Sequence, residues 1–254
     1  MSTTPSALRL LRHATLVVRY GGATVLVDPM LADEGSTPPI ENSPNEKRNP
    51  LVPLPTVDLR AIDAVAVTHT HRDHFDEVAM ETLPSDLPLF CQPPDEETIE
   101  KAGFTDVRPV EDSVEWEGIT ITRTGGRHGH DDLAEKMGPV SGFVFTADEE
   151  PSLYVAGDTR WCAELCNAFA THTPDVIVVN AGGARFDEGK PITMTAADVE
   201  RVCRARPNAT VIPVHMDAIN HCLESRADLE QALTEAGVIS QVVIPEDGEW
   251  VPLE

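Results

Sequence analysis

The sequence predicts an α/β fold, and three features of its pattern support that class. The first half is rich in short apolar or β-branched runs separated by turn residues, as expected of strands. The second half alternates such runs with helical segments. Several predicted strands lead directly into a histidine or an aspartate, and α/β folds usually gather ligands at the carboxyl ends of their strands.

Length and composition are those of an ordinary globular protein. The 254 residues suffice for one large or two small domains, and we expect a single domain over residues 1–254. The hydrophobic fraction is 41% and the charged fraction 24%. No apolar run approaches about 18 residues, so no membrane span is expected. The start, Met1 to Pro5, has no basic region ahead of an apolar core, which predicts no secretory signal and a cytoplasmic protein.

The charge balance is strongly acidic, with 43 Asp and Glu against 19 Lys and Arg and a formal net charge of −24. Such a chain repels the phosphate backbone, so we expect no nucleic-acid partner. The five scattered cysteines do not form the pattern of a disulfide framework. The sequence is compatible with a homo-oligomer but does not fix the oligomeric state.

The first half is predicted to hold strands, two short helices and one long loop. Strands are predicted at residues 8–11, 15–19, 24–27, 62–67, 107–110 and 119–123. Helices are predicted at residues 75–83 and 94–102. Residues 32–59 are rich in Pro, Asn, Ser and charge and form a loop insertion. A loop that covers the substrate and a mere family insertion both fit this segment.

The second half is predicted to alternate strands and helices after a glycine-rich loop that carries His128 and His130. Strands are predicted at residues 142–146, 153–156, 176–179, 210–214 and 241–244. A helix is predicted at residues 160–170. Two further helices begin at capping boxes, one running from Thr195 to about residue 206 and one running from Ser225 to a stop at Gly237.

The densest cluster of candidate ligands follows the apolar run at residues 64–67. It holds three of the nine histidines of the chain within six residues. His69 and His71 alternate in an extended segment, so their side chains can converge on one ion. Asp73 and His74 lie beyond the bend and can reach a second ion. Imidazole and carboxylate ligands suit zinc, with manganese and iron as alternatives.

Residues from elsewhere in the chain complete two ligand sets. A two-metal site needs about three ligands for each ion and an oxygen between them. His69, His71 and one histidine of the glycine-rich loop form the first set, with His128 and His130 as the alternatives. The second set consists of Asp73, His74 and His215, and Asp158 is the carboxylate between the sets.

These residues resemble a known superfamily. The run Thr68-His69-Thr70-His71-Arg72-Asp73-His74 matches the His-x-His-x-Asp-His signature of the metallo-β-lactamase superfamily. The later loop histidine, Asp158 and His215 follow in that superfamily's order. Thr193-Met194, after a Gly-Gly loop, is most similar to the branch of L-ascorbate-6-phosphate-lactonase-like metal-dependent hydrolases.

The resemblance implies a fold, a ligand choice and a chemistry. The fold is an αβ/βα four-layer sandwich with two mixed sheets flanked by helices. His128 is favoured over His130, because it directly follows the strand and the Gly-Gly turn. The chemistry is hydrolysis by a metal-bound hydroxide at a dinuclear site, with Asp73 and Asp158 in catalytic roles. A lactone or related cyclic ester is the expected substrate. A phosphodiesterase acting on a small or nucleotide substrate and a non-hydrolytic metal-binding or redox protein are the alternatives.

Residues for substrate binding are predicted from position alone. His130, Arg160 and His221 lie next to the motifs and are expected to contact a small-molecule substrate. His13 either approaches the site from the first hairpin or bonds to backbone. Asp28 is expected to orient a ligand histidine rather than bind metal itself.

Overall fold

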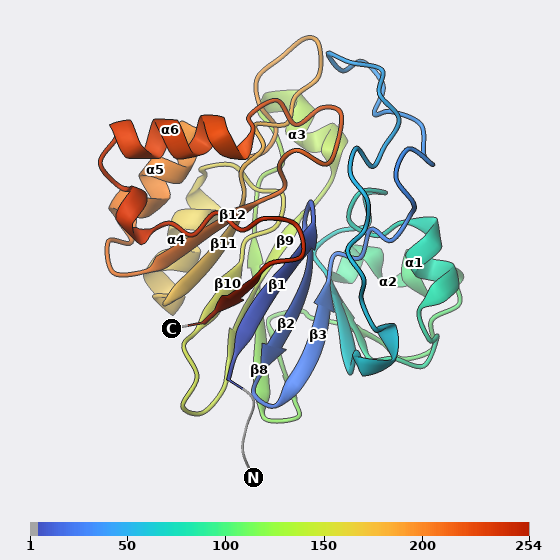
Figure 1. Ribbon diagram of the computed structural model, residues 1–254. Helices are drawn as coiled ribbons and strands as arrows, with labels where there is room; N and C mark the ends of the chain where they lie inside the picture. Colours follow the sequence, from blue (N-terminus) through green and yellow to red (C-terminus); the bar gives the residue numbers. More distant parts are fainter. Residues whose placement is uncertain (1–4, 254) are drawn as a thin grey trace.

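The computed structural model describes residues 5–253 and consists of two β-sheets packed face to face, with helices on both outer sides (Figure 1). This αβ/βα arrangement confirms the predicted fold class. The expectation of no secretory signal rests mainly on residues 1–4, which lie outside the described residues. Among residues 5–253, no helix is both long and apolar enough to cross a membrane.

The first sheet has seven strands in the order β13-β1-β2-β3-β4-β5-β6. The strands β13, β1, β2 and β3 pair antiparallel, and β3 to β6 pair parallel. Their bounds are β1 Ala7–Arg12, β2 Thr15–Tyr20, β3 Ala23–Val27, β4 Ala64–Val67, β5 Leu89–Cys91, β6 Val107–Pro109 and β13 Trp250–Pro252.

The second sheet has six strands in the order β12-β11-β10-β9-β8-β7. The strands β10, β11 and β12 are parallel, whereas β7, β8, β9 and β10 form an antiparallel meander. Their bounds are β7 Ser113–Trp116, β8 Ile119–Gly125, β9 Ser141–Thr146, β10 Leu153–Val155, β11 Val176–Asn180 and β12 Thr210–Val214.

The helices cover the outer faces of the two sheets (Figure 1). The α-helices are α1 Glu77–Thr82, α2 Glu96–Lys101, α3 Asp131–Met137, α4 Ala163–His172, α5 Ala196–Ala205 and α6 Arg226–Glu235. Short 3-10 turns lie at Leu59–Ala61, Pro93–Asp95 and Ile239–Gln241. The capping boxes predicted at the starts of α5 and α6 are present.

Three apolar clusters hold the layers together. One lies between the sheets and takes inward side chains from both, such as Leu8, Phe90, Phe143 and Ile212. A second joins the second sheet to α4, α5 and α6, and a third joins the first sheet to α1 and α2. Burial of apolar surface on both faces explains why the parallel strands read as continuous apolar runs.

One predicted strand is wrong. The strand expected at residues 241–244 is instead the end of a 3-10 turn followed by an isolated bridge between Val242 and Val211. Pro245 comes directly after the predicted strand and has no N–H to donate, so the pairing does not continue. The last strand of the chain is β13, which pairs with β1 in the other sheet.

Several short elements were missed or shifted. The helix predicted at residues 160–170 begins later, because Cys162 is its extended N-cap residue. The strands β5 and β7 have only three and four residues, which is too short for a periodic signal. Helix α3 buries no residue, so it has no apolar stripe that the sequence can reveal.

Candidate metal centre

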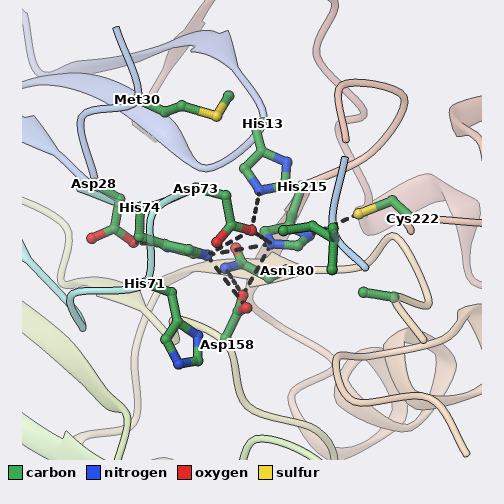
Figure 2. A network of polar contacts seen from close by, with 12 residues as sticks. His13, Asp28, Met30, His71, Asp73, His74, Asp158, Asn180, His215 and Cys222 are labelled. Carbon is green, nitrogen blue, oxygen red and sulfur yellow. Dashed lines mark hydrogen bonds and ion pairs between the residues drawn. The ribbon is translucent and has the colours of Figure 1, made fainter. Parts of the chain in front are cut away.

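All seven predicted metal ligands come together at one edge of the two sheets, beyond the carboxyl ends of their parallel strands. Figure 2 shows five of them: His71, Asp73, His74, Asp158 and His215. The motif loop follows β4, and Asp158 follows β10. His128 lies in the loop after β8, and His215 follows β12 directly. His130, the other histidine of the glycine-rich loop, is not in the cluster.

The first donor group consists of His69, His71 and His128, whose nearest nitrogen atoms lie within 4.8 Å of one another. The Nε2 atom of His69 is 3.0 Å from the Nδ1 atom of His71. His69 and His128 are almost fully buried, whereas His71 is half-buried. On its far side, His69 Nδ1 lies 3.1 Å from the hydroxyl of Thr68.

Backbone carbonyls fix the other two rings of this group. His71 Nε2 donates to the carbonyl of Met137 at 3.0 Å. His128 Nδ1 donates to the carbonyl of Ile192, also at 3.0 Å. Because a carbonyl oxygen can only accept, the hydrogen sits on the outer nitrogen of each ring. The inner nitrogen of each ring therefore presents a lone pair to the centre.

The second donor group consists of Asp73, His74 and His215, and His13 lies beside it. The Nε2 atoms of His74 and His215 face each other at 3.3 Å. His13 Nε2 is 3.1 Å from Asp73 Oδ2. His13 is fully buried and contacts a carboxylate rather than backbone, which decides between its two predicted roles.

Ionisable side chains fix the rings of the second group. The carboxylate of Asp28 accepts from His74 Nδ1 at 2.7 Å, and also from the backbone N–H and the hydroxyl of Thr68 at 2.7 Å each. Asp28 thus orients a ring, as the sequence predicted. The thiol of Cys222 lies 3.4 Å from His215 Nδ1.

Asp158 lies between the two groups. Its Oδ2 atom is 3.3 Å from His74 Nε2 and 3.4 Å from His128 Nε2, and its Oδ1 atom is 3.3 Å from His215 Nε2. The side-chain amide of Asn180 donates to Oδ1 at 2.6 Å and fixes the carboxylate. Asp158 therefore contacts both groups at once.

This set of donors fits divalent metal ions. Ring nitrogens face one another at 3.0 and 3.3 Å, with their outer nitrogens already bonded to acceptors or a thiol. Lone pairs so close repel unless a cation lies between them, and the two carboxylates add the charge that such a cation requires. The donor set of imidazole and carboxylate is that of zinc, iron or manganese sites.

The two groups differ in electrostatics. Burial lowers the pKa of His128 to about 4, although Asp158 opposes this shift. Burial also disfavours the charged form of His74, but Asp158 and Asp28 outweigh it and raise the pKa of His74 to about 10. The same competition between burial and Asp158 raises the pKa of His215 well above its ordinary value. In the metal-free protein, a proton on His74 or His215 thus takes the place between the facing nitrogens that a metal ion would fill.

The backbone around the centre is held in uncommon conformations. His13, Asp28 and His215 have φ angles of 55°, 44° and 68°, in the left-handed region that non-glycine residues rarely adopt. At Gly182, an added Cβ would lie 2.2 Å from the carbonyl oxygen of His215, so only glycine permits this approach. Such strain persists where the surrounding structure fixes the backbone, as it does at functional sites.

A cavity of about 200 Å³, the reaction cavity, opens onto the centre. It is lined by Ile40, His71, Arg72, Asp73, His128, Met137, Asp158, Phe186 and His221. His221, one of the predicted substrate residues, is thus in its wall. The other two are not: His130 is the N-cap residue of α3, and the Arg160 guanidinium donates to the carbonyl of Gly129 at 2.6 Å.

Sequence reasoning missed three residues that shape the centre. Asn180 was noted only as the residue that follows a strand, Cys222 only as one of five scattered cysteines, and Thr68 only as part of the motif. Asn180 carried a usable signal, because it ends β11 between the strands that lead to Asp158 and His215. The contact of Cys222 depends on a turn after β12 that the sequence does not predict.

Comparisons with known proteins agree with this geometry. A family model described as a beta-lactamase superfamily domain matches residues 23–216. The chain is 42% identical to the UPF0173 protein YddR of Bacillus subtilis (strain 168), over 94% of this chain and 96% of that protein. It is 27% identical to the UPF0173 metal-dependent hydrolase Ta0764 of Thermoplasma acidophilum, over 89% of each.

Two solved structures are similar over nearly their whole length. A possible metal-dependent hydrolase from Veillonella parvula DSM 2008 has a TM-score of 0.95 and 36% identity, covering 98% of this chain and 100% of that one. An isothiocyanate hydrolase from Delia radicum gut bacteria has a TM-score of 0.92 and 37% identity, covering 96% and 98%.

The fold, the cluster of histidines and aspartates, and these matches define an enzyme of the metal-dependent hydrolase class. The chain belongs to the metallo-β-lactamase superfamily, as its His-x-His-x-Asp-His motif indicated. The narrower resemblance to the L-ascorbate-6-phosphate-lactonase-like branch is not specifically supported by these relatives.

Proposed function

We propose that this enzyme is a dinuclear hydrolase of small, uncharged electrophiles, and that an isothiocyanate is its substrate. His69, His71 and His128 would hold one ion, and Asp73, His74 and His215 would hold the other. Asp158 lies between these two groups. The observation that carries the two-ion assignment is the position of this carboxylate, within 3.4 Å of ring nitrogens from both groups.

Zinc is the expected ion, with manganese and iron as alternatives. When bound, such ions would lower the pKa of a coordinated water toward about 7 and polarise the atom that is attacked. Asp73 lines the reaction cavity, where its carboxylate can accept the proton that water loses, and its contact with His13 holds the carboxylate in place. His221 is buried in the wall of the reaction cavity, and its Nδ1 atom has no partner among the described residues. It is suited to give a proton to a departing nitrogen.

The charges around the reaction cavity favour an uncharged substrate. Among the described residues that line it, Arg72 is the one arginine or lysine, and its guanidinium donates to the carbonyl of Pro39 at 2.8 Å. Asp73 and Asp158 add negative charge. A phosphate or carboxylate remote from the reacting centre would have only Arg72 to pair with among these lining residues. This disfavours a phosphorylated lactone, whereas a phosphodiester, whose reacting phosphate would meet the ions themselves, is tested by experiment.

Isothiocyanates satisfy this requirement and are also suggested by the 37% identical isothiocyanate hydrolase. Their hydrolysis needs water alone. The oxygen of water bonds to the central carbon, and its two protons move to nitrogen. The carbon–nitrogen bond then breaks, so that R–NCS and water give the amine R–NH₂ and carbonyl sulfide. No oxidant or further co-reactant is required. The enzyme would work on this small molecule in the cytoplasm.

An activity screen of the metal-loaded protein tests the proposal. It compares a simple alkyl isothiocyanate, an uncharged lactone and bis-p-nitrophenyl phosphate, with amine release as the readout for the first. We expect the isothiocyanate to be turned over with the largest kcat/KM. A larger kcat/KM for the lactone would instead support a lactone substrate, as the sequence suggested. Cleavage of the phosphodiester alone, or no hydrolysis of any of the three, would refute the proposal.

A further inference from the structure

We propose that a second cavity beside the centre, which we call the tail pocket, binds an apolar alkyl or aromatic substituent of the substrate. It lies between the long loop, helix α1 and the turn after β12, and its volume is about 340 Å³. This is within the range of small-ligand pockets, about 300–1,000 Å³. The inference rests on the proposed function for the reacting group but concerns a different part of the substrate.

The tail pocket adjoins the reaction cavity. Ile40, Arg72 and Asp73 line both hollows. Asp73 belongs to the second donor group, so the pocket begins one side chain away from the centre. Met30, another wall residue, is included with Asp73 in Figure 2. A substrate whose electrophilic carbon lies at the centre can therefore extend its substituent into the tail pocket.

The wall is mainly apolar, and most of its polar groups are already bonded within the protein. The apolar lining includes Met30, Pro38, Ile40, Pro50, Val78 and Ile219.

Hydrogen bonds within the protein engage several polar groups of this wall. The carboxylate of Asp76 accepts from the backbone N–H groups of Ala32 and Ala79 at 2.7 and 2.8 Å. The hydroxyl of Thr37 donates to the carbonyl of Asn49 at 3.0 Å. The lining also includes Arg72 and Glu77, which are exposed to solvent. The surface left for a ligand is mainly apolar, and its burial favours an uncharged hydrocarbon group.

The long loop forms one wall of the pocket because Asn220 holds it in place. Asn220 is fully buried, and its Oδ1 atom accepts from the Ile40 N–H at 2.9 Å and from Asn49 Nδ2 at 2.8 Å. Its Nδ2 atom donates to the carbonyls of Ile40 and Asn45 at 3.1 and 2.8 Å. The loop is thereby fixed to the same turn that carries His221. Of the two roles left open by the sequence, a loop that covers the substrate is the one that this anchoring supports.

Substitution of Val78 tests the tail pocket directly. Val78 lies on α1 with 38% of its surface exposed, so a larger side chain can enter the pocket without disturbing the core. Val243 has the same exposure, 38%, and lines neither cavity, so Val243→Trp is the matched control. The measured quantity is the ratio of kcat/KM for 2-phenylethyl isothiocyanate to that for methyl isothiocyanate.

We expect the wild-type ratio to exceed about 10, since each buried methylene contributes about tenfold or more to kcat/KM in an apolar pocket. Val78→Trp should lower the ratio at least about tenfold, because it fills the space of the tail. Val78→Asp should also lower this ratio, because it places a carboxylate in the tail pocket. Val243→Trp should leave it within twofold. A wild-type ratio near 1, or Val78 variants within twofold of wild type, would overturn the inference.

A binding measurement separates this inference from the proposed function. N-(2-phenylethyl)acetamide carries the same tail without the reactive group, and its binding to the metal-loaded protein is measured by calorimetry. Affinity that falls at least about tenfold in Val78→Trp, and not in Val243→Trp, supports the tail pocket even if no isothiocyanate is hydrolysed. Turnover of both isothiocyanates without any dependence on Val78 leaves the proposed function standing and refutes the tail pocket.

Discussion

Both donor groups of the centre present histidine ring nitrogens, but different chemical groups hold those rings in place. In the first group, the outer ring nitrogens bond to neutral oxygens: the hydroxyl of Thr68 and the carbonyls of Met137 and Ile192. In the second group, they contact a carboxylate and a thiol, those of Asp28 and Cys222. The first group is thus oriented mainly by the path of the backbone, and the second by ionisable side chains.

This difference explains the separation in proton affinity. His128 has one carboxylate nearby, Asp158, and burial still lowers its pKa to about 4. His74 has two, Asp158 and Asp28, which outweigh burial and raise its pKa to about 10 in the metal-free protein. A carboxylate partner also makes a ligand imidazole more basic and orients it for metal. We therefore expect substitution of a supporting side chain to weaken metal binding more in the second donor group than in the first, where backbone carbonyls support two of the three rings.

The largest expected effect comes from removing a ligand of the first group. His128→Ala should lower metal content and reduce kcat/KM by more than about 100-fold, the upper end of what loss of a mere supporting partner causes. His130→Ala is the matched control, because His130 lies two residues away and outside the cluster. Metal content is measured by plasma mass spectrometry. Equal losses in the two variants would make the assignment of His128 wrong.

A smaller but still large effect is expected from the carboxylate behind the second group. Asp28→Asn should weaken binding of one ion by about 10- to 100-fold, because it removes the charge that orients His74. Thr68→Val should cost less, because it removes a neutral contact of His69 and one hydrogen bond to Asp28 but leaves the charge of Asp28 and its bond to His74 in place. Competition with a chelator measures both affinities. If Thr68→Val weakens binding as much as Asp28→Asn does, the contrast between the groups does not hold.

The smallest effect is expected at the thiol. Cys222→Ser should weaken binding of one ion by up to about tenfold, since the shorter serine side chain leaves its oxygen farther from His215 Nδ1 than the sulfur, which lies at 3.4 Å. The same chelator competition applies, and Cys166→Ser is the control, because Cys166 is exposed on α4. An unchanged affinity in Cys222→Ser would mean that the thiol does not support the second group.

Much of the fold and of the cluster could be predicted from sequence. The buried parallel strands read as apolar runs, and the capping boxes of α5 and α6 gave their starts. The seven candidate ligands lie in a short motif or directly at strand ends, so one edge of the sheets gathers them all. His13 could not be assigned, because its approach depends on a left-handed turn between β1 and β2.

What the sequence could not predict depends on contacts between distant segments. The strand expected at residues 241–244 had the right composition, but Pro245 ends the pairing and β13 occupies the other sheet. Arg160 looked free to bind substrate, yet its guanidinium holds the backbone of the glycine-rich loop. Asn220 gave no signal at all, because its partners lie about 170–180 residues earlier in the long loop.

Metal stoichiometry tests the central claim, a centre of two donor groups that share Asp158. Wild-type protein is stripped with a chelator, saturated with zinc, freed of excess metal and analysed together with His128→Ala and His74→Ala. We expect two ions per chain in the wild type and about one in each variant. One ion per chain in the saturated wild type would contradict the claim.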